Sequence, residues 1–171
     1  MKPHWIEKTD PTVYPARAIA AQWQKLMASN YRVNIRFLSH KEYGQFRDLH
    51  RFLGDWTQFV VEWMTVPSHW RHFTESVRQE ARLLIIPLVP HLGFLLEQRT
   101  RALRIMREYL RDSESPEDIR FVREQDLLFC KRALEAKALL CGAKMEVIHK
   151  ITTASTPAEI QAVFNEIQGE N

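Results

Sequence analysis

The residues best suited to bind a ligand are arginines that recur along the middle of the chain. The stretch between Lys41 and Lys131 contains no lysine but twelve arginines. A planar guanidinium forms paired hydrogen bonds with phosphate or carboxylate groups, whereas a lysine ammonium acts as a point charge. Because successive helical residues turn by about 100°, four of these arginines would share one side of a helix. We predict that they form an anion-binding stripe: Arg101, Arg104, Arg107 and Arg111.

Acidic residues in the same stripe leave a second interpretation open. Glu97 and Glu108 lie three or four residues from arginines of the stripe, which is the spacing at which helical side chains pair. The stripe is then either a solvated, salt-bridged face or a surface for a nucleic-acid backbone or an acidic protein. A second basic set precedes it and would contribute to the same anion-contacting surface: Arg32, Arg36, Arg47 and Arg51.

The distribution of charge favours an anionic partner for the first two-thirds of the chain. The 171 residues carry a formal net charge of +3. Residues 1–112 contain 17 basic and 11 acidic side chains, whereas residues 113–171 contain 7 basic and 10 acidic ones. A basic surface on one side of a protein is the electrostatic pattern that phosphate backbones require. The small total charge therefore conceals a basic part and an acidic part.

Bulky apolar residues recur every seven positions from Leu49 to Val77. Trp56, Trp63 and Trp70 occupy this register, and aromatic or aliphatic residues fill the positions three further on. Aromatic side chains dominate both protein cores and the energetically important centres of interfaces. An intramolecular core is the first expectation for the three tryptophans, and a partner interface formed by Trp56, Trp63 and Trp70 is the alternative. Pro67 interrupts the register, so two consecutive helices are expected.

Signals for catalysis and for cofactors are weak. The five glycines are widely separated, which excludes the glycine-rich loops that bind nucleotide phosphates. Cys130 and Cys141 are too few for a disulfide framework or a four-ligand zinc site. We therefore predict no catalytic residue, no metal site and no cofactor. The alternative is a small helical-bundle enzyme or metal binder whose pocket would use His69, His72, His91 or Glu146.

One pair of charges falls among apolar neighbours. Arg99 shares its helical face with leucines, and Asp126 is placed in the same way on a later helix. A buried charge needs a partner. We expect Arg99 and Asp126 to pair, with an Arg99 side chain that extends to solvent as the alternative.

The elements that position these residues are predicted to be helices. Ser39 and Glu42 have the spacing of a capping box, and Pro15, Pro116 and Pro157 stand at favourable first positions of helices. Apolar periodicity predicts five to six helices, one of which runs without a break from about residue 116 to residue 151. The fold class is therefore an all-α, elongated helical bundle, a single domain over residues 1–171 with an N-terminal arm at residues 1–11.

Two segments depart from helical periodicity. Apolar and polar residues alternate from Tyr31 to Phe37, which predicts one short edge strand near residues 31–37, with a linker or a further helical turn as alternatives. The apolar run from Leu83 to Leu96 is 14 residues long and contains two prolines. Because a bilayer span needs about 20 residues, we predict that this run is buried core and that the chain has no membrane partner.

These features together resemble no family that we can identify. They favour a non-catalytic helical subunit or adaptor of a larger protein or nucleoprotein assembly, which contacts RNA or DNA backbone through its arginine-rich helix faces. The expected partners are protein subunits and nucleic acid. The N-terminal sequence lacks the apolar region of a signal peptide, so a cytoplasmic location is expected. Besides the enzyme, a regulator that binds only protein is a further alternative.

Overall fold

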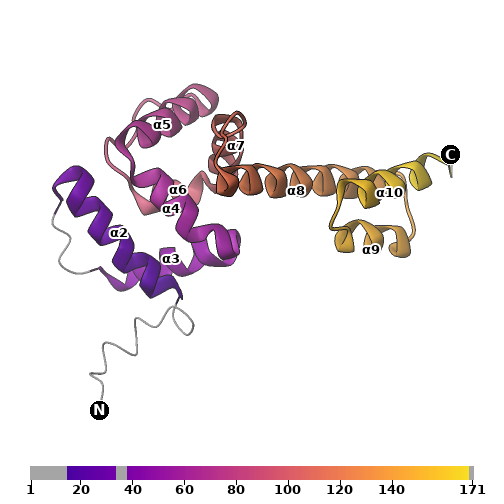
Figure 1. Cartoon of the computed structure of the whole chain (residues 1–171), viewed down its shortest axis with the longest axis horizontal. Coiled ribbons are helices and arrows are strands. Elements are labelled where there is room, and N and C mark those ends of the chain that lie inside the picture. Colours follow the sequence, from indigo (N-terminus) through magenta and orange to yellow (C-terminus); the bar gives the residue numbers. More distant parts are fainter. Residues whose placement is uncertain (1–14, 34–37, 170–171) are drawn as a thin grey trace, which may run out of the picture. The chain divides into compact units, whose positions relative to one another are not determined.

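The computed structural model describes residues 15–33 and 38–169 (Figure 1). Within these ranges every regular element is a helix, so the predicted all-α class is confirmed. The described residues form nine α-helices and one short 3₁₀ helix, which is more than the five to six predicted. The predicted arm, residues 1–11, lies outside the described residues.

The predicted strand does not begin at Tyr31, because Tyr31 is the last residue of helix α2 (Pro15–Tyr31). Ile19, Trp23 and Met27 form the buried stripe of α2 at intervals of four, and Tyr31 continues that interval. Arg32 then has a left-handed φ of 55°. Residues 34–37, the rest of the predicted strand, lie outside the described residues.

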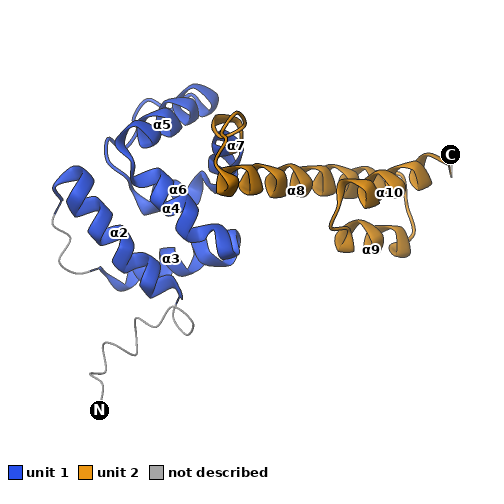
Figure 2. Ribbon diagram, in the orientation of Figure 1, with its two compact units in different colours: residues 1–106 blue, residues 107–171 orange. Residues whose placement is uncertain are grey.

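The single domain predicted over residues 1–171 contains two compact units, residues 1–106 and residues 107–171 (Figure 2). In unit 1, α2 packs on α3 and α4, α3 also packs on α6, and α4 also packs on α5. The bounds of the other elements of unit 1 are α3 (His40–Leu53), η1 (Gly54–Trp56), α4 (Thr57–Thr65), α5 (Pro67–Ala81) and α6 (Leu92–Glu97). Helix α7 (Arg99–Tyr109) contains the division between the two units.

Aromatic side chains fill the core of unit 1. Trp23 and Phe46 join α2 to α3, with ring centroids 5.9 Å apart in an edge-to-face arrangement. Of the three tryptophans in the heptad register, Trp70 is 1% exposed and Trp63 is 8% exposed, whereas Trp56 is half-buried. Trp63 and Trp70 thus contribute to the core, which was the first expectation, and not to the partner interface that was its alternative. The heptad register places them there because it follows the side of α4 and of α5 that packs in the core.

The apolar run from Leu83 to Leu96 is only partly buried, in contrast to the prediction. Leu92 and Leu95 lie in the core, but Leu84, Ile85 and Leu88 are 98%, 87% and 88% exposed. Helix α5 ends at Ala81, and the capping residue that follows it, Arg82, adopts a left-handed φ of 54°. The segment that follows contains two prolines and forms no helix before α6, so its side chains are not turned toward the core by helical periodicity.

Unit 2 is built on three helices that all contact one another: α8 (Pro116–Leu140), α9 (Met145–Thr153) and α10 (Pro157–Gly169). The helix predicted to continue to residue 151 instead ends at Leu140. Gly142 has a positive φ of 69° and reverses the chain, which lets the amide of Ala143 donate to the carbonyl of Ala138 at 2.9 Å. The turn folds α9 back onto α8. The core between the helices consists of Leu134, Ala138, Val147, Ile151, Val163 and Ile167.

Across residues 15–33 and 38–169, none of the helices combines the length and the apolar character that a membrane span needs.

Candidate anion-binding site

The predicted arginine stripe on α7 is largely occupied by ion pairs within the chain. In unit 1, the Arg101 Nε lies 3.7 Å from the Glu80 carboxylate, and Arg104 donates a hydrogen bond to the same carboxylate. Arg101 also donates from Nη1 to the Gln98 side chain at 2.7 Å. One acid on α5 thus neutralises part of the charge of two arginines on α7. This matches the salt-bridged interpretation of the stripe, with Glu80 on a second helix as the acid that the two arginines share.

Arg107 has a structural role in unit 2. Its Nη1 lies 3.3 Å from the Asp126 carboxylate, and its guanidinium stands 4.2 Å from the centroid of the Phe129 ring. The Arg107 side chain is only 17% exposed. A guanidinium held between a carboxylate and an aromatic face has little surface left for a ligand. Arg111 follows the end of α7, is exposed and forms no ion pair with the described residues.

Asp126 forms an ion pair, but its partner is Arg107 and not the expected Arg99, and the Asp126 side chain is 49% exposed. Arg99 instead donates to the carbonyl of Leu96 at 2.8 Å and lies 5.1 Å from the Phe52 ring centroid. Arg99 is exposed, so the alternative of a side chain that extends to solvent describes it. Helical angle alone did not distinguish the two arginines, because the choice depends on which of them lies within reach of Asp126 in the folded chain.

The second predicted basic set is more open to solvent. Arg32, Arg47 and Arg51 are exposed, and Arg36 lies outside the described residues. Arg51 approaches Asp48 at 3.9 Å, with both side chains more than half exposed, and such surface pairs contribute little. Arg47 forms no ion pair or hydrogen bond with the described residues. This set therefore retains positive charge that a ligand can reach.

A hollow of about 390 Å³ lies beside Arg47, between the start of α2 and one face of α3. Its volume falls within the range of about 300–1,000 Å³ that is typical of small-ligand sites. Among the described residues that line it, none is acidic. The lining consists of Pro15, Ala16, Arg17, His40, Tyr43, Gly44, Arg47 and His50.

The spacing of the residues on α3 explains why they share the hollow. Positions 40, 43, 47 and 50 recur at intervals of three or four, which places them on one face of the helix. The opposite face holds the buried side chains of Phe46, Leu49 and Leu53. The capping box predicted from Ser39 and Glu42 is present, and it sets where this helix begins. This polar face and the first turn of α2 together line the hollow.

Arg17 supplies the contribution of α2. Its guanidinium lies 5.4 Å from the centroid of the Tyr43 ring, so the two side chains meet across the interhelical space. Gly44 contributes no side chain, and its missing Cβ would lie 4.0 Å from the Arg47 guanidinium. Because Gly44 has no side chain, the space between Tyr43 and Arg47 remains open as part of the hollow.

The hollow has the chemistry of an anion site. Two guanidinium groups can each bind a phosphate oxygen pair, and a histidine ring offers an N–H donor in either neutral tautomer. The Tyr43 ring and the guanidinium planes are surfaces on which an unpaired base can stack. Four residues of the hollow were not predicted from the sequence: Arg17, His40, Tyr43 and His50. The signal that could have found them is the polar periodicity of residues 40–50 combined with a basic residue early in the preceding helix.

The histidines of the enzyme alternative have structural contacts. The His69 ring stacks on Trp63 with centroids 4.4 Å apart, and its Nδ1 lies 3.0 Å from the Trp63 carbonyl oxygen. The His91 ring accepts a hydrogen bond from the amide of Phe94 and so caps α6. In the part of the chain that the structure describes, no group of three or more histidine, cysteine or acidic side chains is arranged to hold a metal ion.

Comparison of the chain with family models, with curated proteins and with solved structures finds no match in any of the three.

Proposed function

We propose that this chain is a non-catalytic helical subunit or adaptor that binds the phosphate backbone of RNA or DNA, and that the hollow between α2 and α3 is the main contact. The observation that carries the proposal is the lining itself: Arg17, Arg47, two histidines and a tyrosine, with no acid among the described lining residues. The net charge of unit 1 supports it, since residues 1–106 contain 15 basic and nine acidic side chains.

The arginines of the hollow and those of the α7 stripe differ in whether an acidic partner already occupies them, and this difference indicates which arginines bind the ligand. Arg101 and Arg104 share the Glu80 carboxylate, so a phosphate would have to displace an existing partner. Arg47 has no such partner among the described residues. Binding should therefore depend on the hollow more than on α7, which reverses the ranking that the sequence suggests. Single-stranded nucleic acid is favoured, because only unpaired bases can stack on Tyr43.

The test is a salt titration of binding to a fluorescein-labelled oligonucleotide of about 20 thymidines, measured by fluorescence anisotropy. The double variant Arg17→Gln/Arg47→Gln removes two cations from the hollow. We expect affinity to fall about tenfold at low salt, and the slope of log K against log salt to decrease by about 1.4, since each lost phosphate contact on a single strand contributes about 0.7.

The matched control is Arg101→Gln/Arg104→Gln, which removes the same charge from α7. We expect its affinity to change less than twofold. Equal losses in the two double variants would show a diffuse electrostatic effect and would contradict a site in the hollow. Binding to poly-glutamate but not to either RNA or DNA would replace the proposal by the protein-binding regulator.

A further inference from the structure

An exposed apolar segment lies between α5 and α6 in unit 1. Leu84, Ile85 and Leu88 are each at least 87% exposed, which is far more than scattered surface leucines show. The segment is nevertheless held in place, because the indole Nε1 of buried Trp70 donates to the carbonyl of Pro87 at 3.0 Å, and Pro90 is buried. We call residues 84–89 the apolar segment. Its order before binding lowers the entropy lost when it docks.

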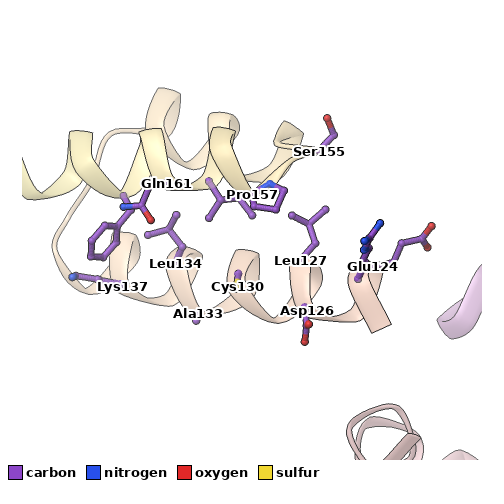
Figure 3. Close-up of a pocket in the computed structure, with 13 residues that line it drawn as sticks. Glu124, Asp126, Leu127, Cys130, Ala133, Leu134, Lys137, Ser155, Pro157 and Gln161 are labelled. Carbon is purple, nitrogen blue, oxygen red and sulfur yellow. The ribbon is translucent and has the colours of Figure 1, made fainter. Parts of the chain in front are cut away.

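An apolar groove of about 790 Å³ lies in unit 2 between α8 and α10. Figure 3 shows Leu127 and Leu134 on α8 in the space that faces Pro157 and Gln161 on α10, with Cys130 between the two leucines. Ile160 and Phe164 complete its apolar lining. Lys137 closes one end, with its Nζ 4.6 Å from the centroid of the Phe164 ring. The groove is open to solvent, and the Cys130 thiol in it is free and exposed.

The two units carry opposite net charges. Residues 1–106 contain 15 basic and nine acidic side chains, a net charge of +6, whereas residues 107–171 contain nine basic and 12 acidic ones, a net charge of −3. Unit 1 of one molecule is therefore attracted to unit 2 of another. Such complementarity steers association and disfavours the pairing of unit 1 with unit 1. The groove lining carries two basic side chains, Arg123 and Lys137, and two acidic ones, Glu124 and Asp126, so the attraction comes from the net charge of each unit.

We propose that the apolar segment of one copy docks into the α8–α10 groove of a second copy. The two surfaces differ, so the contact is head-to-tail. The copy that supplies the segment still has a free groove, and the copy that supplies the groove still has a free segment. Repetition of this contact builds either a closed ring or an open filament. The inference rests on unit 2 and residues 84–89 and does not depend on the anion site.

The two cysteines allow this contact to be mapped on the unmodified chain. Cys130 lies in the groove, whereas Cys141 is exposed outside the groove lining. We expect N-ethylmaleimide to alkylate Cys130 at least tenfold more slowly at high protein concentration than at low concentration, while the rate at Cys141 stays the same. Rates at Cys130 that do not depend on protein concentration would overturn the proposal.

Paired variants test the direction of the contact by sedimentation velocity. The segment variant is Leu84→Ser/Ile85→Ser/Leu88→Ser, and the groove variant is Cys130→Arg; both change exposed positions, so circular dichroism should show an intact fold. We expect each variant to be monomeric alone and an equimolar mixture to form a dimer and nothing larger, because only one complementary pair remains. The control Leu139→Ser/Leu140→Ser changes two exposed leucines outside the groove lining and should associate like the unmodified chain.

Three results would overturn the proposal. The first is self-association that persists in either variant, and the second is a mixture in which no dimer forms. The third is a chain that stays monomeric at all concentrations but binds phosphatidylserine vesicles, with the binding lost in the segment variant; the apolar segment would then contact a lipid surface.

Discussion

At the scale of the residue, the neighbours of an arginine decide what it does. Arg47 and Arg107 have the same chemistry, yet Arg107 is held by Asp126 and the ring of Phe129, whereas Arg47 lines an open hollow. Arg101 and Arg104 stand between these extremes, since they share Glu80. The number of arginines in the sequence shows only that part of the chain is basic. Which arginines can bind a ligand depends on the acidic side chains that neighbouring helices place beside them.

The pKa of an acidic side chain also depends on its neighbours, and the carboxylate of Glu159 provides a test of this. The Glu159 carboxylate accepts hydrogen bonds from the backbone amide of Ser155 at 2.6 Å and from the Ser155 hydroxyl at 3.3 Å. These bonds, with the backbone amide the largest contribution, hold the pKa of Glu159 below its ordinary value of 4.5. Because the folded chain favours the ionised carboxylate, that carboxylate stabilises the start of α10 above the unfolded pKa. The contribution is lost as pH falls through the lower folded pKa.

We expect an NMR titration of the Glu159 side-chain carboxyl carbon to give a midpoint below 4.5 in the folded chain. The same carbon in the urea-unfolded chain should titrate near the ordinary value. The variant Glu159→Gln should flatten the acid limb of the stability curve of unit 2. Identical midpoints in the folded and unfolded chains would show that the hydrogen bonds to Ser155 do not form in solution.

At the scale of the element, the sequence predicts helices well where the local signal is complete. Ser39 and Glu42 predicted the start of α3 correctly, since both hydrogen bonds of a capping box involve residues close in sequence. The α8–α9 break was missed because Gly142 is a single residue inside an otherwise continuous apolar pattern. Tyr31 was assigned to a strand because it belongs to two patterns at once, the four-residue interval of α2 and the alternation that follows.

The two sites depended on information that lies between elements. The polar face of α3 can be read from residues 40–50, but the hollow exists only because Arg17 on α2 meets Tyr43. The groove of unit 2 needs Leu127 and Leu134 to face a second helix, α10. No spacing within one segment predicts how two helices meet, so the sequence alone could not place either site.

We expect substitution by alanine to change the free energy of unfolding in opposite directions at Gly44 and Gly142. Gly44 lies inside α3, and an added Cβ would approach nothing closer than the Arg47 guanidinium at 4.0 Å. We expect Gly44→Ala to raise the free energy of unfolding by about 1 kcal/mol, because alanine favours the helix. Gly142 has a φ of 69°. We expect Gly142→Ala to lower the free energy of unfolding by about 1 kcal/mol, because a side chain disfavours that conformation.

Urea unfolding followed by circular dichroism measures both changes. The two substitutions add the same methyl group, so each serves as the control for the other. If both variants were destabilised, the methyl at position 44 would be in conflict with the lining of the hollow. If neither were destabilised, the turn after α8 would not need its left-handed residue.

At the scale of the whole molecule, each of the two units has its own core and its own charge. The core of unit 1 is built from aromatic residues such as Trp23, Phe46 and Trp70, and that of unit 2 from aliphatic ones such as Leu134 and Ile151. The proposed functions divide in the same way, with anion binding in unit 1 and the groove for a second copy in unit 2. Because the chain divides into two compact units, we expect each unit to unfold by its own transition.

The distribution of tryptophan makes this expectation measurable. All five tryptophans precede residue 107, so tryptophan fluorescence reports on unit 1 alone, whereas far-ultraviolet circular dichroism reports on the helices of both units. Ile151 is 0% exposed in the core of unit 2. We expect Ile151→Ala to destabilise unit 2 by about 3 kcal/mol, which shifts part of the dichroism transition but leaves the fluorescence transition in place. Met64→Ala, a buried position of unit 1, should shift the fluorescence transition instead. A fluorescence transition that follows Ile151→Ala would mean that the two units fold as one cooperative structure.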